Sequence, residues 1–251
     1  MMKNLYFKTS YGLMAYNYLS NQKSKTLVLL HGWGISKETF ESLMEVFKDK
    51  YDLLLVDFLG FGHSEEPKKV ISVAQYTKTL YEIICYLDLK NICLLGHSFG
   101  GRIALEYASK YNLSELILVN SAGLSNRNLC FYLKLFKYKV KKWFYKLFNK
   151  EKYKNFVRKT ASTDYKNASP KMRLVMKKIL KKNQKKILKK IKCKTLIIAG
   201  VKDRIISYKD NEILKKKIKN SILIPFYHSG HFCYLDEEKK FIKEVMLFLG
   251  E

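Results

Sequence analysis

The segment best suited to chemistry is Gly96-His-Ser-Phe-Gly100, in which a serine lies between two glycines. An apolar run over 92–95 predicts a buried strand before it, and apolar side chains at helical spacing follow it. A G-x-S-x-G sequence between a strand and a helix predicts a nucleophile elbow, a sharp turn that presents the Ser98 hydroxyl. The alternative is a glycine-rich connection without chemistry. Two roles are open for Arg102, just after the turn: pairing with a nearby acid, which is the favoured expectation, or contact with a substrate carboxylate.

A serine hydroxyl becomes nucleophilic only when a base removes its proton and a third group orients that base. Asp203 comes just after an apolar run, and His231 follows Ser-Gly at the start of the last loop-to-helix passage. Ser, Asp, His is the chain order that accompanies this kind of elbow. Asn120 is not an acid and His228 has the weaker context, so Ser98, Asp203 and His231 are the predicted triad.

A tetrahedral intermediate needs two N–H donors for its oxyanion. The amide of Phe99, directly after the nucleophile, is the first candidate. The second is the amide of Trp33 in His31-Gly-Trp-Gly, a segment that follows the apolar run at 26–30. The alternative for this segment is a tight turn with a packed indole. The nearby Asp57-x-x-Gly-x-Gly-x-Ser64 segment predicts a structured turn that supports the site without chemistry of its own.

The elements that must position these residues alternate between strands and helices. Such alternation predicts a mainly parallel sheet with helices on both faces, and ligands bind at the carboxyl ends of its strands. Every candidate loop follows a predicted strand, so we expect the candidate residues to gather along one edge. Strands are predicted in a hairpin within 4–19 and at 26–30, 53–57, 92–95, 116–120, 195–200 and 221–226, and helices at 36–48, 72–88, after 100, at 211–218 and at 237–249.

The composition is that of a folded globular protein. The chain has 251 residues, 47% hydrophobic and 28% charged, which fits one α/β domain with an insertion. No run of about 18 apolar residues appears, and the N-terminus builds no signal-peptide core, so a cytoplasmic location is expected. The five cysteines form no C-x-x-C pair, which favours reduced thiols.

Most of the positive charge lies in one segment. Residues 125–192 hold 24 Lys or Arg against two acids, and therefore +22 of the net charge of +26. Apolar residues from Leu129 to Phe148 are spaced for one helical face, and a second helical region is predicted over 172–191. The favoured interpretation is a lid whose apolar face covers the site while its lysines face water. The sharper hypothesis is contact with an anionic membrane, or guidance of an acidic substrate. Nucleic acid is not expected, because no binding module accompanies the charge.

Together these motifs resemble the α/β-hydrolase superfamily, over the whole chain apart from the basic insertion. The resemblance implies an eight-stranded core sheet, a triad of Ser98, Asp203 and His231, and an oxyanion hole of the Trp33 and Phe99 amides. Serine at the elbow distinguishes the chain from the epoxide hydrolase and haloalkane dehalogenase branches. The chain is similar instead to the serine-nucleophile branch with a helical cap, which includes esterases and carbon–carbon-bond hydrolases.

The sequence thus predicts an α/β-hydrolase core over 1–124 and 193–251 and a helical, lysine-rich cap over 125–192. The expected reaction is hydrolysis of an ester, thioester or similar acyl bond in a small-molecule substrate, without a metal or organic cofactor. Two alternatives stay open because fold does not determine reaction. One is cleavage of a carbon–carbon bond in a keto acid by the same triad, as a hydrolase or lyase. The other is a non-enzymatic receptor for a small ligand.

Overall fold

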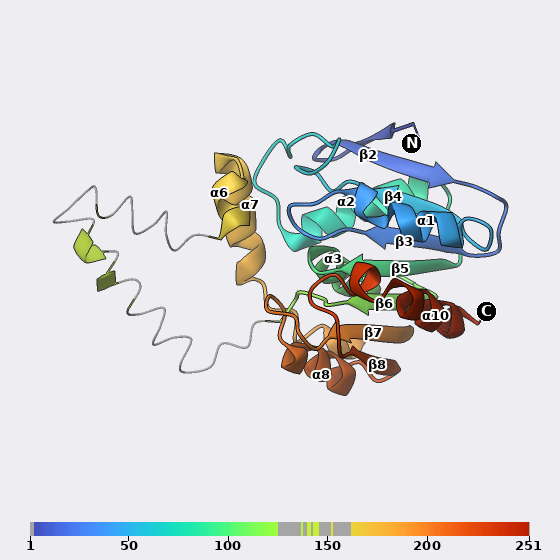
Figure 1. The fold of residues 1–251 in the computed structure, drawn as a ribbon. Helices are drawn as coiled ribbons and strands as arrows, with labels where there is room; N and C mark the ends of the chain where they lie inside the picture. The colour runs from blue at the N-terminus through green and yellow to red at the C-terminus, as the bar shows by residue number, and fades with distance from the viewer. Residues whose placement is uncertain are drawn as a thin grey trace.

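A computed structural model describes residues 3–124, 137, 140–141, 143–145, 152 and 162–250. Its centre is an eight-stranded sheet with the order β1-β2-β4-β3-β5-β6-β7-β8 (Figure 1). The first two strands are antiparallel to their neighbours and the other six run parallel. The predicted mainly parallel eight-stranded sheet is confirmed. The strands are β1 (Leu5–Thr9), β2 (Gly12–Leu19), β3 (Thr26–Leu30), β4 (Asp52–Val56), β5 (Ile92–His97), β6 (Glu115–Val119), β7 (Lys194–Gly200) and β8 (Ser221–Phe226).

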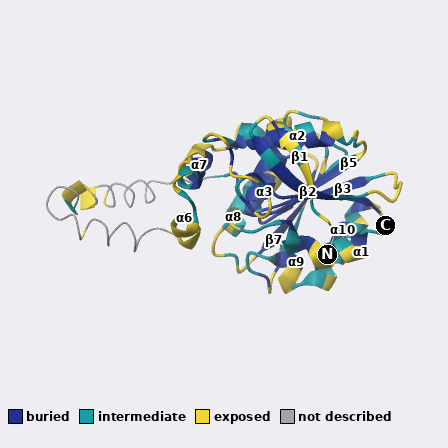
Figure 2. Cartoon of the chain, turned by 90° about the horizontal axis from the view of Figure 1, so that it is seen from above, coloured by how far each residue is buried: buried dark blue, intermediate teal, exposed yellow. Residues whose placement is uncertain are grey.

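Helices cover both faces of this sheet, which is why the central strands are continuous apolar runs. All residues of β3 and β4 are buried, and the strands lie between two layers of helices (Figure 2). The helices of one layer share a hydrophobic cluster with one face of the sheet, and those of the other layer share a second cluster with the opposite face. The first layer contains α2 (Val73–Tyr86), α3 (Phe99–Ala108) and α8 (Tyr208–Lys217); the second contains η1 (Lys37–Phe40), α1 (Glu41–Phe47), α9 (Cys233–Asp236) and α10 (Glu238–Leu249).

The parallel strands β3 to β8 have their carboxyl ends at the same edge of the sheet, and the candidate residues lie just beyond those ends. This placement follows from the strand registers and confirms the expected gathering along one edge. The residues that follow the strand ends, in chain order, are Trp33, Asp57, Ser98, Asn120, Asp203 and His231.

The free N–H groups at the starts of two helices find acceptors in different ways, one from a local group and the other from a distant one. Helix α2 begins with a capping box between Ser72 and Gln75, a purely local arrangement. Ser36, expected to cap the first helix, makes no such side-chain bond, and the helix begins instead with the 3-10 turn η1. The Lys37 backbone N–H, at the first position of η1, donates to Asp57 Oδ1 at 2.8 Å, so a carboxylate from another loop satisfies one of the free N–H groups at this helix start.

Helices α6 (Thr163–Asn167) and α7 (Pro170–Lys181) lie across the loops at the carboxyl edge. The predicted helical region over 172–191 is wrong in its second half, since α7 ends at Lys181 and only η2 (Leu188–Lys190) follows. The chain must leave the helix there because the Gln184 side chain is fully buried and bonded to the core. The apolar face predicted from Leu129 to Phe148 lies mostly outside the described residues.

Arg102 does not pair with an acid as expected. Its guanidinium donates to the carbonyl oxygens of Ile179 and Lys182, at 3.1 and 2.6 Å, where α7 ends. The C-terminal carbonyls of a helix lack intrahelical donors and carry partial negative charge, so they are suitable acceptors. The buried arginine therefore joins the end of α7 to the start of α3.

Within the part of the chain that is described, no helix has the length and apolar character needed to span a membrane.

Candidate active site

Ser98 has the backbone conformation of an elbow. It lies between β5 and α3 with φ 51° and ψ −108°, a left-handed conformation that is strained for a residue with a side chain. The turn is possible because of its glycines. A Cβ at Gly100 would lie 2.1 Å from the carbonyl oxygen of Leu30, so no other residue fits without displacing β3. The strand–turn–helix geometry predicted for this segment is therefore present.

Asp203 and His231 come together across the loops after β7 and β8. His231 Nδ1 lies 2.7 Å from Asp203 Oδ2, with the N–H as donor in the tautomer that a charged carboxylate favours. Asp203 Oδ1 also accepts the backbone N–H groups of Ile205 and Ile206, at 2.6 and 3.0 Å. Burial opposes the charged form of Asp203, but these hydrogen bonds outweigh it and lower the pKa of the carboxyl. The pair orients the imidazole and leaves its Nε2 available.

The structure connects His231 to the elbow through His97, the residue before Ser98. His97 Nε2–H donates to the His231 carbonyl oxygen at 2.9 Å, and the two ring centroids are 4.7 Å apart. Among the described residues, no hydrogen bond joins the Ser98 hydroxyl to the imidazole of His231. Such bonds are often long without substrate and tighten in the reacting complex. The backbone of the candidate base is nevertheless held beside the candidate nucleophile.

Asn120, which the sequence analysis set aside because it is not an acid, is a positioning residue. It is fully buried at the end of β6 with φ 43°, a conformation that asparagine tolerates better than most residues. Its Oδ1 accepts the Gly200 N–H at 2.9 Å, and its Nδ2 donates to the carbonyl oxygens of Gly230 and His231, at 2.9 and 3.0 Å. One amide side chain thus joins β6, β7 and the histidine loop. Its position at a strand end was the only sequence signal.

The side chains of the two residues that carry the candidate oxyanion donors are neighbours. The Trp33 and Phe99 rings pack edge to face with centroids 5.4 Å apart, and Phe61 packs against the same indole at 4.7 Å. Within the described part of the chain, neither the Trp33 nor the Phe99 backbone N–H donates to a protein acceptor. Both N–H groups therefore remain available at the end of the sheet where Ser98 lies.

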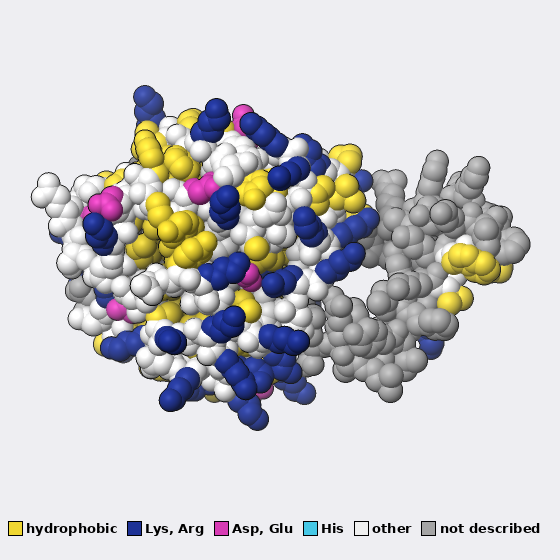
Figure 3. Space-filling view, turned by 180° about the vertical axis from the view of Figure 1, so that it is seen from behind, with side chains coloured by type: hydrophobic (Ala, Val, Ile, Leu, Met, Phe, Trp, Pro, Cys, Tyr) yellow, Lys and Arg dark blue, Asp and Glu magenta, His cyan; other side chains and the backbone are white. Residues whose placement is uncertain are grey.

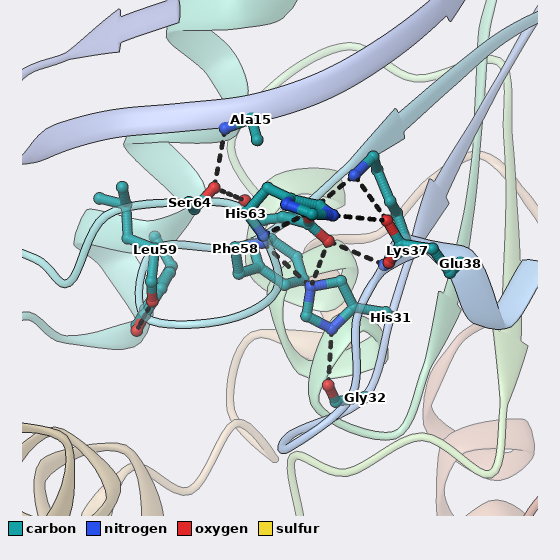
Figure 4. Close-up of polar contacts among 11 residues, drawn as sticks. Ala15, His31, Gly32, Lys37, Glu38, Phe58, Leu59, His63 and Ser64 are labelled. Carbon is teal, nitrogen blue, oxygen red and sulfur yellow. Dashed lines mark hydrogen bonds and ion pairs between the residues drawn. The ribbon is translucent and has the colours of Figure 1, made fainter. Parts of the chain in front are cut away.

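A network of polar contacts that includes Lys37, His63 and Ser64 supports the loop that carries Trp33 (Figure 4). Asp57, fully buried, accepts the Lys37 backbone N–H and its Nζ, both at 2.8 Å, and the His63 backbone N–H at 2.9 Å. Ser64 Oγ donates to the Asp57 carbonyl oxygen at 2.6 Å and closes the turn. The loop after β3 is thereby fixed to the loop after β4. The structured turn predicted over 57–64 is confirmed.

Two buried histidines, His31 and His97, lie close to the site and have lowered pKa values. The His31 Nδ1–H donates to the Gly32 carbonyl oxygen at 2.7 Å, and its Nε2 accepts the Phe58 N–H at 3.0 Å. Burial, the largest influence, lowers the pKa of His31 to about 4. Burial and the neighbouring His231 lower the pKa of His97 to about 3. Both rings are therefore neutral in the folded protein at pH values where they would be charged in the unfolded chain.

We expect stability to fall as the pH is lowered from 7 to 5. The unfolded chain takes up protons at His31 and His97 below a pKa near 6.5, whereas the folded chain does not until the pH approaches 4. Each histidine should then lower the free energy of unfolding by about 2 kcal/mol between pH 7 and pH 5. Urea unfolding at both pH values measures this, with His97→Gln as a variant that should show a smaller difference. Equal pH dependence in the two proteins would contradict the assignment.

The comparisons with known proteins agree with this geometry. A family model described as alpha/beta hydrolase fold matches residues 25–171, and the chain belongs to that family. A lipase of Psychrobacter immobilis, Lipase 1, is 30% identical over 245 residues, which cover 87% of this chain and 74% of the lipase. The AB hydrolase superfamily protein YisY of Bacillus subtilis is 28% identical over 241 residues, 86% of this chain and 88% of that protein.

A solved structure shows the same fold over nearly the whole chain. An esterase from Exiguobacterium antarcticum superposes with a TM-score of 0.78 at 23% sequence identity, covering 99% of this chain and 100% of the esterase. At that identity the likeness concerns the fold. The α/β-hydrolase resemblance seen in the sequence motifs is therefore confirmed by both sequence and structure.

Proposed function

We propose that the protein is a serine hydrolase that cleaves an ester, thioester or similar acyl bond through an acyl-enzyme intermediate. The observation that carries the proposal is the 2.7 Å contact between His231 and Asp203 at the sheet edge where the strained Ser98 elbow lies. A lipase among the relatives and an esterase among the structural neighbours favour acyl substrates. No cofactor is needed for this chemistry.

In the proposed acylation, Ser98 Oγ attacks the carbonyl carbon of the substrate and its proton passes to His231 Nε2. The charged Asp203 stabilises the imidazolium and keeps the ring in the required orientation. Negative charge develops on the former carbonyl oxygen, where the Trp33 and Phe99 amides are placed to donate. When the tetrahedral intermediate collapses, His231 gives the proton to the leaving alcohol or thiol.

Deacylation repeats these steps with water. His231 takes a proton from a water molecule, and the resulting hydroxide attacks the acyl carbon bound to Ser98. The same two amides stabilise the second oxyanion. The bond to Ser98 Oγ then breaks, the oxygen regains its proton from His231, and a carboxylic acid leaves. The enzyme returns to its starting state, so no group is consumed.

We further propose that residues 125–192 form a cap over this site, with 1–124 and 193–251 as the hydrolase core. Support comes from the described part of the segment, where Met172 packs against Gly60 and Asp164 lies beside Gly34. A cavity of about 240 Å³ lies at this seam, next to the loop of Trp33. It is lined by Trp33, Gly34, Gly60, Phe61, Glu66, Asp164, Asn167, Ala168, Ser169 and Met172.

A fluorophosphonate probe tests this proposal, because it reacts only with a serine activated by its neighbours. Stoichiometric labelling of the wild-type protein is expected, with the adduct mapped to Ser98 by mass spectrometry and absent from His231→Ala. If the protein bound small ligands but the probe did not label it, a small-ligand receptor would be favoured instead. A panel of short p-nitrophenyl esters beside a dienol keto acid separates acyl cleavage from carbon–carbon cleavage. Turnover of the keto acid alone would overturn the ester proposal.

A further inference from the structure

Four lysines face a groove between the end of the basic segment and α8. Lys185, Lys186 and Lys189 precede or belong to η2, and Lys217 ends α8; with Asn183 they line a groove of about 510 Å³. No carboxylate is among the lining residues. In the chain as described, none of the four ammonium groups lies within ion-pair distance of an Asp or Glu. Like charges arranged around one hollow repel each other, and an anion placed there relieves the repulsion.

The groove continues into a second one. Lys189 also lines the adjoining groove of about 530 Å³, together with Lys110, Lys190 and Lys192. Of these, Lys110 is paired with Glu106 at 2.8 Å. Viewed from behind, Lys and Arg side chains gather over the lower half of the molecule with few carboxylates among them (Figure 3). We call Lys185, Lys186, Lys189, Lys190, Lys192 and Lys217 the basic strip.

The turn that carries most of the basic strip is fixed to the core by Gln184. The Gln184 backbone N–H donates to the Gly123 carbonyl oxygen, and its Nε2 donates to the Arg102 carbonyl oxygen, both at 2.9 Å. Leu188 is fully buried in the core between the lysines. Arg102, in turn, holds the end of α7 through two carbonyl oxygens. The lysines therefore project from an ordered turn, so only their side chains, and not the backbone that carries them, must be ordered on binding.

Exposed apolar side chains elsewhere in the basic segment distinguish among polyanions. Leu174 and Leu180 of α7 are 51% and 56% exposed, although both lie on a helix otherwise rich in lysine. In the described part of the insertion, Trp143 and Phe144 are 62% and 52% exposed. Aliphatic and aromatic side chains interleaved with lysines suit the boundary between lipid headgroups and acyl chains. The phosphates of a nucleic acid provide no apolar contact for the two leucines.

We propose that the basic strip docks the protein on an anionic phospholipid bilayer, with the exposed apolar side chains of α7 entering the headgroup region. Each lysine near such a surface contributes favourable electrostatic energy to binding, and salt weakens this contribution by screening. The inference does not depend on the proposed reaction. The inference places the proposed reaction at a membrane surface, because α7 extends from the strip to the loops at the carboxyl edge, where Met172 packs against Gly60.

Vesicle flotation tests the proposal with the full chain. The groove variant replaces Lys185, Lys186, Lys189 and Lys217 with Gln. The matched control removes the same charge elsewhere, by replacing the exposed Lys8, Lys23, Lys239 and Lys243 with Gln. Vesicles of phosphatidylcholine are compared with vesicles containing about 30% phosphatidylglycerol, at about 0.05 M and 0.5 M salt. Circular dichroism and thermal unfolding establish that both variants fold.

The wild-type protein and the control should float with the anionic vesicles at low salt, and neither should float with neutral vesicles. The groove variant should bind at least about tenfold more weakly, with high salt releasing all three. An equal loss in the control would overturn the proposal, because net charge alone would then explain binding. So would failure of the wild-type protein to float, or tight binding to RNA or duplex DNA without binding to vesicles.

Discussion

Ser98→Ala is expected to lower kcat/KM on a reactive ester by at least about 10⁴-fold, with KM for the same ester little changed. The substitution removes the atom that forms the covalent bond to the acyl group, and no other described serine has the elbow geometry. The two candidate oxyanion donors and the Asp203–His231 pair remain. A small residual rate above that of water is therefore expected from binding and electrostatic stabilisation.

The fold should tolerate Ser98→Ala well. Alanine has the same Cβ as serine, so the strain of φ 51° is unchanged, and the backbone bond from Ser98 N to the Val119 carbonyl oxygen at 3.0 Å is retained. Thermal unfolding should consequently be close to that of the wild-type protein. Ser114→Ala, at the opposite edge of the sheet, is the matched control and should keep full activity. Turnover by Ser98→Ala above about one hundredth of the wild-type rate would refute the assignment of the nucleophile.

Asp203→Asn is expected to lower kcat by about 10³- to 10⁴-fold. An amide in place of the carboxylate can present an N–H to His231 Nδ1, and the ring then carries its proton on Nε2, where a base is needed. The new side-chain oxygen can still accept the Ile205 and Ile206 N–H groups, so the loop after β7 should stay in place. The loss should therefore appear in kcat, measured in a steady-state assay, more than in KM.

Stability measurements separate this catalytic effect from unfolding. Because hydrogen bonds lower the pKa of Asp203, its charged form stabilises the fold above the unfolded pKa near 4, and that stabilisation is lost as the pH falls further. Asp203→Asn should therefore be somewhat less stable at pH 7 and less sensitive to strong acid. Asp49→Asn, an exposed change, should alter neither activity nor stability. Full activity in Asp203→Asn would assign the acid to another residue.

Most of the elements, and the elbow, follow from the sequence by itself, because they depend on neighbours in the chain. An apolar run long enough for one strand, a Ser72–Gln75 capping box and two glycines around Ser98 each act over a few residues. The order of Ser98, Asp203 and His231 then sufficed to predict a triad at one edge, since parallel strands bring their carboxyl ends together. The structure brings the acid and the histidine of that triad into contact.

The partner that each buried polar group obtains depends on how distant parts of the chain pack together. Arg102 is bonded to carbonyl oxygens 77 and 80 residues away, and the Lys37 N–H to a carboxylate 20 residues away. Asn120 holds a loop more than 100 residues later in the chain. Such groups need hydrogen-bond partners because an unpaired buried donor or acceptor costs free energy. The local sequence pattern, however, does not identify those partners. Packing brings the partners together, and packing depends on the whole chain.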